Sequence, residues 1–200
     1  MTAKIKLNAA SGGGSFSLQA PSSSSNNRVM TVPDTADGTV LTTTNSQVLQ
    51  TVKTDTFSVN GTATADVTGL SVAITPSSSS SKILVTYNLS VAVESGGFNG
   101  FIFLLRGSTQ IYLGDAASSR TRASSFVTSH SATDFGAYEM FDLSGSFLDS
   151  PATTSATTYK IQMRSQNSGR NFYLNRHNND SDGSGSPRTA SSITVQEVAG

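Results

Sequence analysis

The sequence contains no cysteine, which excludes disulfides, thiolate metal sites and cysteine nucleophiles. Charge is also scarce: 13 basic and 13 acidic side chains make up 13% of the 200 residues, and the formal net charge is zero. The basic surface typical of nucleic-acid binding is therefore absent, as is an acidic tail, and no nucleic-acid partner is predicted. A chain without disulfides needs another source of stability, and we expect self-association to provide it.

Long apolar runs are missing as well. No segment approaches the roughly 20 apolar residues that a membrane helix needs. The opening MTAKIKLNAASGGG turns polar too soon to form the apolar core of a signal peptide. The sequence therefore predicts synthesis in a cytoplasm, no Sec export and no membrane insertion.

No part of the sequence shows a helical period of convincing length, whereas short alternating apolar patterns are frequent. The pattern is strongest in KILVTYNLSVAVE, where every second residue from Ile83 to Val93 is apolar, and it recurs in TYKIQMRS and SSITVQEV. In YEMFDLSGSFL the apolar phase changes between Met140 and Phe141, which predicts a β-bulge or a bend there. Together these patterns predict an all-β protein with a jelly roll or β-sandwich.

The chain divides into three parts by composition and by the density of alternating apolar patterns. Residues 1–45 hold the short β-like pieces KIKLN, SFSLQA, RVMTV and GTVLTT, residues 46–81 read as a connecting β segment, and residues 82–200 form the main body. The first strands bury too little surface to be stable alone, so we expect them to order against sister chains or a docking partner. A disordered leader is the alternative. The apolar residues that would dock are Ile5, Leu7, Phe16, Leu18, Val29, Val32, Val40 and Leu41.

The stretch FIFLL is apolar on both faces, unlike the other strands of the main body. In a two-layer sandwich one face of each strand packs in the core and the other meets water. A covered second face predicts a subunit interface, with a long loop over the strand as the alternative. The interface candidates are Phe101, Ile102, Phe103, Leu104 and Leu105.

Several stretches along the chain carry a resemblance. They are SKILVTYNLSVAV, FLLRGSTQIYLGDAASSRTR, FLDSPATTSATTYKIQMRS, YLNR and RTASSITVQEVAG. These resemble the C-terminal domains of tailed-bacteriophage fibres and related virion proteins, which are common in marine and cyanobacterial phages. The opening IKLNAASGGGSFSLQAPSSSSNNRVMTVPDTADGTVLTTTN looks like the N-terminal or shaft-type modules of the same class.

The resemblance implies a non-enzymatic, homotrimeric virion structural protein. Residues 1–45 would attach it to other virion proteins (tail, portal, adaptor or capsid), and the jelly roll would face outward. The chain is too short for an extended shaft, which leaves open a short fibre, a tail-attached adaptor or a capsid-surface fibre. We predict a short tail fibre that helps bind the host surface. A capsid-surface decoration protein, head fibre or structural adaptor without receptor binding is the alternative.

The loop NNDSDGSG is the best metal candidate. Asn178, Asp180 and Asp182 alternate and Gly183 follows, as in the first half of a calcium loop. The twelfth position needs a bidentate carboxylate, but it is Thr189. The loop therefore reads as a polar connection between strands, and no metal or other cofactor is predicted.

Catalytic signatures are equally weak. His130 and His177 have no metal or catalytic spacing, and no G-x-S-x-G elbow accompanies the many serines. Strand phase scatters Glu139 and Asp142 across opposite faces, which disfavours a glycosidase pair. A polysaccharide-degrading enzyme is thus the least favoured of the functions considered, and we predict no enzyme activity. The acidic cluster considered is Asp134, Glu139, Asp142 and Asp149.

The loops offer more plausible binding chemistry. Arginine can hold a carboxylate or phosphate with two hydrogen bonds, and aromatic faces can stack on sugars. Such groups would suit an anionic glycan of the host envelope, while solvated turn residues or interchain ion pairs are the alternative. The receptor-binding candidates are Arg120, Arg122, Arg170, Tyr173, Arg176 and His177.

Overall fold

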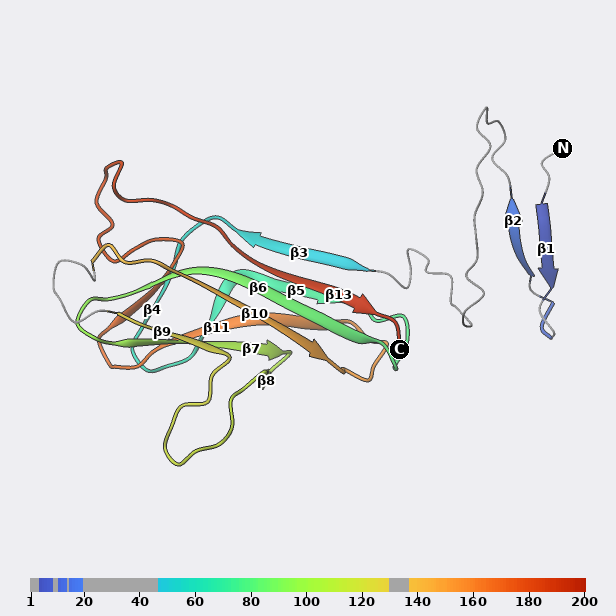
Figure 1. Ribbon diagram of the computed structural model, residues 1–200, viewed down its shortest axis with the longest axis horizontal. Helices are drawn as coiled ribbons and strands as arrows, with labels where there is room; N and C mark the ends of the chain where they lie inside the picture. The colour runs from blue at the N-terminus through green and yellow to red at the C-terminus, as the bar shows by residue number, and fades with distance from the viewer. Residues whose placement is uncertain (1–3, 9–10, 14, 20–46, 130–136) are drawn as a thin grey trace, which may run out of the picture. The chain divides into compact units, whose positions relative to one another are not determined.

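The computed structural model describes residues 4–8, 11–13, 15–19, 47–129 and 137–200 (Figure 1). The chain forms two compact units, residues 1–40 and 41–200. All strand pairs of the described residues are antiparallel, and these residues contain no helix, so none that could cross a membrane. The protein is therefore all-β over the described ranges, as the sequence predicted.

The first unit holds a two-stranded hairpin, in which β1 (Lys4–Asn8) pairs with β2 (Ser15–Gln19). Leu7 lies opposite Phe16, and the Leu7 side chain is 60% exposed. Leu7 is one of the expected docking residues. For Ile5, Phe16 and Leu18, three others, the structure describes the position on the strand but not the side chain. The remaining four, Val29, Val32, Val40 and Leu41, lie outside the described residues. Docking through this segment stays a prediction.

The second unit consists of strands that form two sheets. Sheet 1 contains β3 (Val48–Lys53), β4 (Phe57–Asn60), β6 (Lys82–Val93), β10 (Phe141–Asp149), β12 (Asn171–Leu174) and β13 (Ser191–Val198). Sheet 2 contains β5 (Ala65–Ile74), β7 (Asn99–Arg106), β8 (Thr109–Ile111), β9 (Ser125–Thr128) and β11 (Thr157–Ser165).

Three strand positions are split into two pieces each. In sheet 1, β13 pairs with one end of β6 and β12 with the other, and β3 and β4 continue that split at the edge. In sheet 2, β8 and β9 pair with opposite ends of β7. Merging the pieces gives the order β3/β4, β13/β12, β6, β10 in one sheet and β5, β11, β7, β8/β9 in the other. Successive strand positions cross between two four-position sheets except at β7 and β8/β9, which are neighbours in sheet 2; this is the topology of a jelly roll.

The core lies between the two sheets and is made by alternate residues of their strands. Every second residue of β6 from Ile83 to Val93 is at most 1% exposed, as its pattern predicted. Tyr159, Ile161 and Met163 of β11 are fully buried from the opposite side. Alternation places these side chains on one face because successive Cβ atoms of a strand point in opposite directions.

The two sheets are tied together by a buried carboxylate. Asp149, at the end of β10 in sheet 1, is 5% exposed. Both of its oxygens accept hydrogen bonds from Arg106 Nη1 of β7 at 3.0 Å, and Oδ2 accepts one from the Tyr159 hydroxyl of β11 at 2.7 Å. Burial, reinforced by the Asp149 carboxylate, raises the pKa of Tyr159 well above its ordinary value of 10.0, so the hydroxyl remains a donor.

A second polar centre joins the split strands of sheet 1. Asn175 follows β12 directly, is fully buried, and has a left-handed φ of 62°, a region that asparagine tolerates better than most residues. Its Nδ2 donates to the carbonyl oxygens of Lys53 and Asp55, each at 2.9 Å, and its Oδ1 accepts from Ser191 Oγ at 2.6 Å. One side chain therefore bridges the break between β3 and β4 and the break between β12 and β13.

Residues 46–81, expected to be a connecting β segment, supply β3, β4 and β5 to the two sheets. The phase change expected to mark a bulge or a bend falls where the chain turns at residues 137–138 and enters β10 at Phe141. From Phe141 onward β10 pairs with β6 without interruption, so the strand itself has no bulge in that pairing. The register break instead separates Lys160 from Gln162 in the pairing of β11 with β5, near Gly69 with its φ of 79°.

Replacement of Asp149 by asparagine should lower the free energy of unfolding by about 2–3 kcal/mol, because hydrogen bonds to a charged group contribute roughly 1.5–3 kcal/mol each. Urea unfolding of Asp149→Asn and Tyr159→Phe against the wild type measures this loss. Tyr159→Phe removes one contact and should cost less. A loss for Asp149→Asn no greater than for Tyr159→Phe would show that the carboxylate does not tie the sheets.

Candidate functional site

The five interface candidates lie on β7, in the middle of sheet 2. Ile102 and Leu104 face the core and are fully buried. On the other face, Phe103 and Leu105 are only 3% and 2% exposed, and Phe101 is half-buried. Both faces of the strand are therefore covered within a single chain.

Long polar side chains of β11 explain the covered outer face. Lys160 lies opposite Leu105, Gln162 opposite Phe103 and Arg164 opposite Phe101. Aliphatic stems of such residues cover apolar neighbours while their polar ends reach water. The two-sided apolar pattern thus has an explanation within one chain and needs no subunit contact through β7.

The polar ends of this cover are held in place. Asp66 of β5 accepts hydrogen bonds from Lys160 Nζ and Gln162 Nε2, both at 2.7 Å. The contact with Lys160, followed by that with Gln162, lowers the pKa of Asp66. The Arg164 guanidinium lies over the ring of Phe101, 5.0 Å from its centroid, and over that of Phe103 at 5.7 Å.

Arg170, a receptor-binding candidate, is only partly exposed and binds other residues of its own chain. Its Nη1 donates to Glu94 at 2.8 Å, and its guanidinium lies 4.3 Å from the centroid of Phe98. Burial alone would raise the pKa of Glu94, but hydrogen bonds from Asn171 and Arg170 outweigh burial, and the pKa lies below the ordinary 4.5. This arginine is placed to fix the end of β6 against β12.

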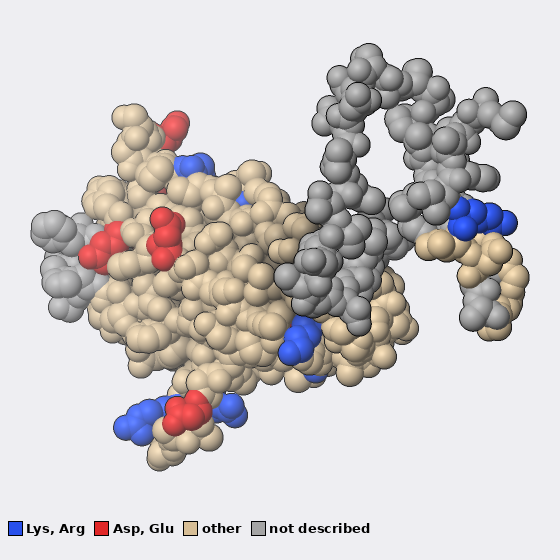
Figure 2. All heavy atoms as spheres, turned by 45° about the vertical axis from the view of Figure 1, so that its right-hand side comes forward, with Lys and Arg blue, Asp and Glu red and all other residues tan. Residues whose placement is uncertain are grey.

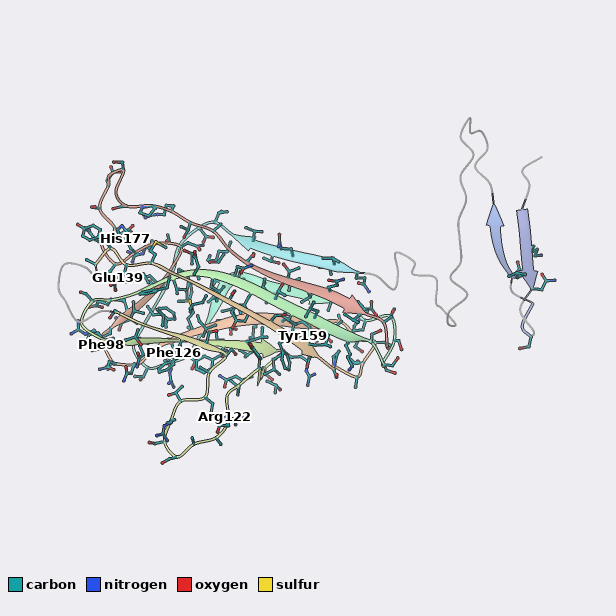
Figure 3. The ribbon with its side chains drawn as sticks, in the orientation of Figure 1. Phe98, Arg122, Phe126, Glu139, Tyr159 and His177 are labelled. Atoms are coloured by element: carbon teal, nitrogen blue, oxygen red, sulfur yellow. The ribbon has the colours of Figure 1, made fainter. Side chains whose placement is uncertain are left out.

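Tyr173, Arg176 and His177 also have internal partners. Tyr173 is 6% exposed and donates to Asn178 Oδ1, while the Arg176 guanidinium lies 4.1 Å from the Tyr173 ring centroid. His177 is 2% exposed and its Nε2 lies 3.1 Å from the carbonyl oxygen of Gly185 (Figure 3). These side chains support the segment between β12 and β13.

The calcium-like loop has a different arrangement from the one its spacing suggests. The Asp180 carboxylate pairs with Arg176 at 3.3 Å and with Arg188 at 2.5 Å. No group of three or more His, Cys, Asp or Glu side chains able to hold a metal occurs in the part of the chain that the structure describes. His130 and Asp134 lie outside the described residues.

Arg120 and Arg122 are the two candidates that face solvent. Both lie on the loop between β8 and β9, which projects from the body in Figure 1 and carries the Arg122 label in Figure 3. Arg122 Nε donates to the Gly114 carbonyl oxygen at 2.7 Å. Its terminal nitrogens and the whole Arg120 guanidinium make no hydrogen bond or ion pair to any described residue. Figure 2 shows basic and acidic side chains together on this projecting loop, at the bottom of the view.

A pocket of about 240 Å³ lies between this loop and sheet 2. We call it the loop pocket. Phe101 of β7 and Phe126 of β9, which are directly opposite each other, line it from the sheet. Asp115, Arg120 and Arg122 line it from the loop.

Phe126 is the functional candidate that sequence reasoning missed. In the stretch SFVT either Phe126 or Val127 must point outward, and hydrophobicity does not decide which. The structure buries Val127 at 5% exposure and leaves Phe126 62% exposed. An outward phenylalanine on a strand beside two arginines is the arrangement that a sugar or another flat ligand can use.

Replacement of Arg170 by glutamine should cost about 1 kcal/mol of stability near neutral pH, since the ion pair is partly exposed. Glu94 has a folded pKa below its unfolded value, so its contribution is present above about pH 4.5 and is lost as the pH falls through the folded pKa. The difference between wild type and Arg170→Gln in urea unfolding should therefore shrink on acidification. Arg122→Gln should match the wild type, and an equal loss in both variants would contradict a structural role specific to Arg170.

No protein-family model matches the chain, and no curated protein sequence does. Similar solved structures come from infectious bursal disease virus. They include a structure of the Gt strain (TM-score 0.38, 11% identity, 94% of this chain and 48% of that chain) and one of the Gx strain (0.34, 12%, 92% and 46%). The VP2 subviral particle of that virus is also similar (TM-score 0.35, 13% identity, 94% and 48%). The chain thus spans about half the length of the chains that it matches.

Proposed function

We propose that the protein is a non-enzymatic structural component of a virus particle, a short trimeric tail fibre. Residues 1–45 attach it to the particle, and the jelly roll is displayed outward. The resemblance of its strand sequences to phage fibre domains supports this proposal. The structural observation that carries it is the outer face of sheet 1.

The outer face of sheet 1 contains no charged residue over a grid of four strands and three rows. We call this grid the neutral face. Cross-strand pairing aligns its rows from β10 through β6 and β13 to β3. The rows are Ser144, Asn88, Ser192 and Val52, then Ser146, Thr86, Thr194 and Gln50, then Leu148, Leu84, Gln196 and Val48.

The neutral face has the properties of a surface that packs against protein. Val48, Val52 and Leu148, at three corners of the grid, are exposed by 59%, 53% and 46% and add apolar surface to it. Protein surfaces designed to stay apart carry roughly 25–35% charged residues, and the central parts of interfaces are depleted of charge. Because the neutral face bears no charge, a second copy of the same chain can approach it without repulsion.

The outer face of sheet 2 differs. It carries Asp66, Lys160 and Arg164, held in the cover over β7. Charge is sparser over sheet 1, where Lys82 and Asp142 lie in the rows that flank the neutral face. We infer that the neutral face packs in the assembly and that the sheet 2 side stays solvated.

Purified full-length protein should form a homotrimer through the neutral face, with three times the chain mass of 20.8 kDa by light scattering. Thr86→Arg, at the centre of the face, should reduce it to a monomer because the guanidinium would be buried without a partner. Gln110→Arg on β8 is the matched control and should remain trimeric. A monomeric wild type would refute the trimer, and a trimeric Thr86→Arg would exclude the neutral face as the contact.

Particles of the virus that encodes the chain should contain it at a low copy number, at the tail. Quantitative mass spectrometry and cryo-EM of intact particles measure its number and its position. A high copy number on the capsid lattice would contradict the tail fibre and identify a decoration protein. Absence from particles would refute the virion role altogether.

A further inference from the structure

We propose that the loop pocket binds an anionic sugar ring, one that carries a carboxylate or a sulfate. The inference deepens the proposed function, because it names the ligand class for the displayed side of the sandwich. It stands on three features of the pocket: an exposed aromatic ring, unpaired guanidinium groups and a small volume.

The aromatic ring is Phe126. A phenylalanine side chain that is 62% exposed contacts little of its own protein, and here it lies across from Phe101 at the edge of a pocket. The face of an aromatic ring is electron-rich, and the C–H groups on one side of a pyranose are apolar and slightly positive. A sugar ring that stacks on Phe126 would cover apolar surface that is otherwise in water.

The guanidinium groups supply the preference for an anion. The bond from Arg122 Nε to Gly114 fixes that side chain at the pocket and leaves its two terminal nitrogens to bind a ligand. A planar guanidinium can donate two parallel hydrogen bonds to a carboxylate or sulfate. Arg120 adds a second positive charge on the same wall.

A third arginine supports the pocket from sheet 2. Arg164 donates from Nη2 to Thr121 Oγ1 at 2.9 Å, and its guanidinium covers Phe101. Thr121 and Phe101 both line the pocket, so Arg164 helps to fix its wall.

Asp115 also lines the pocket and opposes a purely anionic ligand. Its carboxylate can accept hydrogen bonds from sugar hydroxyls, donors that a sulfate ion lacks. Two arginines against one aspartate leave a net positive wall with both kinds of partner. This combination suits a ring with hydroxyls and one acidic group better than a simple anion.

The volume limits the ligand to about one ring. Pockets that enclose drug-sized molecules measure roughly 300–1,000 Å³, whereas this one measures about 240 Å³. A nucleic-acid strand would need a basic groove along its backbone, and the whole chain has a net charge of zero. The loop pocket also lies on sheet 2, so packing through the neutral face of sheet 1 leaves it open.

The test measures binding of a hexuronate-containing disaccharide to the full-length protein by isothermal titration calorimetry and saturation-transfer NMR. A neutral disaccharide of the same linkage, inorganic sulfate and a nucleoside monophosphate are the comparison probes. We expect the hexuronate disaccharide to bind most tightly, with its ring protons receiving saturation from aromatic protons. No binding of that disaccharide, equal binding of the neutral one, or tighter binding of sulfate or the nucleotide would overturn the proposal.

Variants locate the site. Arg122→Gln should weaken binding about tenfold, the effect expected for one charge-assisted hydrogen bond, and Phe126→Ala should do so by removing the stacking surface. Both side chains project from the body, so circular dichroism should be unchanged. Arg188→Gln, which removes an exposed arginine elsewhere, is the matched control. Unchanged affinity in Arg122→Gln and Phe126→Ala, or an equal loss in Arg188→Gln, would place the sugar outside the loop pocket.

These measurements separate this inference from the proposed function. They use purified protein and do not require a particle. Sugar binding by a chain that neither trimerises nor enters particles would refute the virion role and support the pocket. Incorporation into particles without sugar binding would support the virion role and refute the sugar site in the loop pocket.

Discussion

The Asp149 carboxylate is the constraint on which the sandwich depends most directly. It belongs to sheet 1, whereas both of its donors, Arg106 and Tyr159, belong to sheet 2. Apolar packing between sheets is strong but has no preferred direction, so it permits the layers to slide. A buried ion with fixed donors allows one alignment only, because any other leaves a charge without partners. The same contact positions β7, the strand from which the loop pocket is built.

The split strand positions show how polar groups adapt a simple jelly roll. Asn175 satisfies backbone carbonyls of Lys53 and Asp55 at the breaks in sheet 1, where the ladder cannot. In sheet 2 the interruption between β8 and β9 instead releases the loop that carries Arg120 and Arg122. Asn175 thus bridges the breaks in sheet 1, whereas the break in sheet 2 becomes a projecting loop. Such loops on a rigid scaffold are the usual location of recognition.

The fold class could be predicted from sequence because alternation over β6, β11 and β13 reports directly which residues are buried. Contacts between distant strands could not. The covered face of Phe103 depends on its register with Gln162, and the role of Arg170 depends on Glu94 lying nearby. Sequence distinguishes a loop arginine from a core leucine, but it does not tell which arginine has a partner. Of the candidate site, it therefore identified the loop and missed Phe126.

The absence of charge on the neutral face has a consequence for ionic strength. Contacts between copies through Thr86, Thr194 and their neighbours would gain nothing from Coulomb attraction, so dissolved salt would have little to screen. Salts that are excluded from protein surfaces would strengthen apolar association. Contacts made through Arg120 and Arg122 lie at the opposite extreme, on an exposed loop. The proposed packing through the neutral face would therefore be insensitive to salinity, whereas the proposed binding of an anion at the loop would weaken as salt rises.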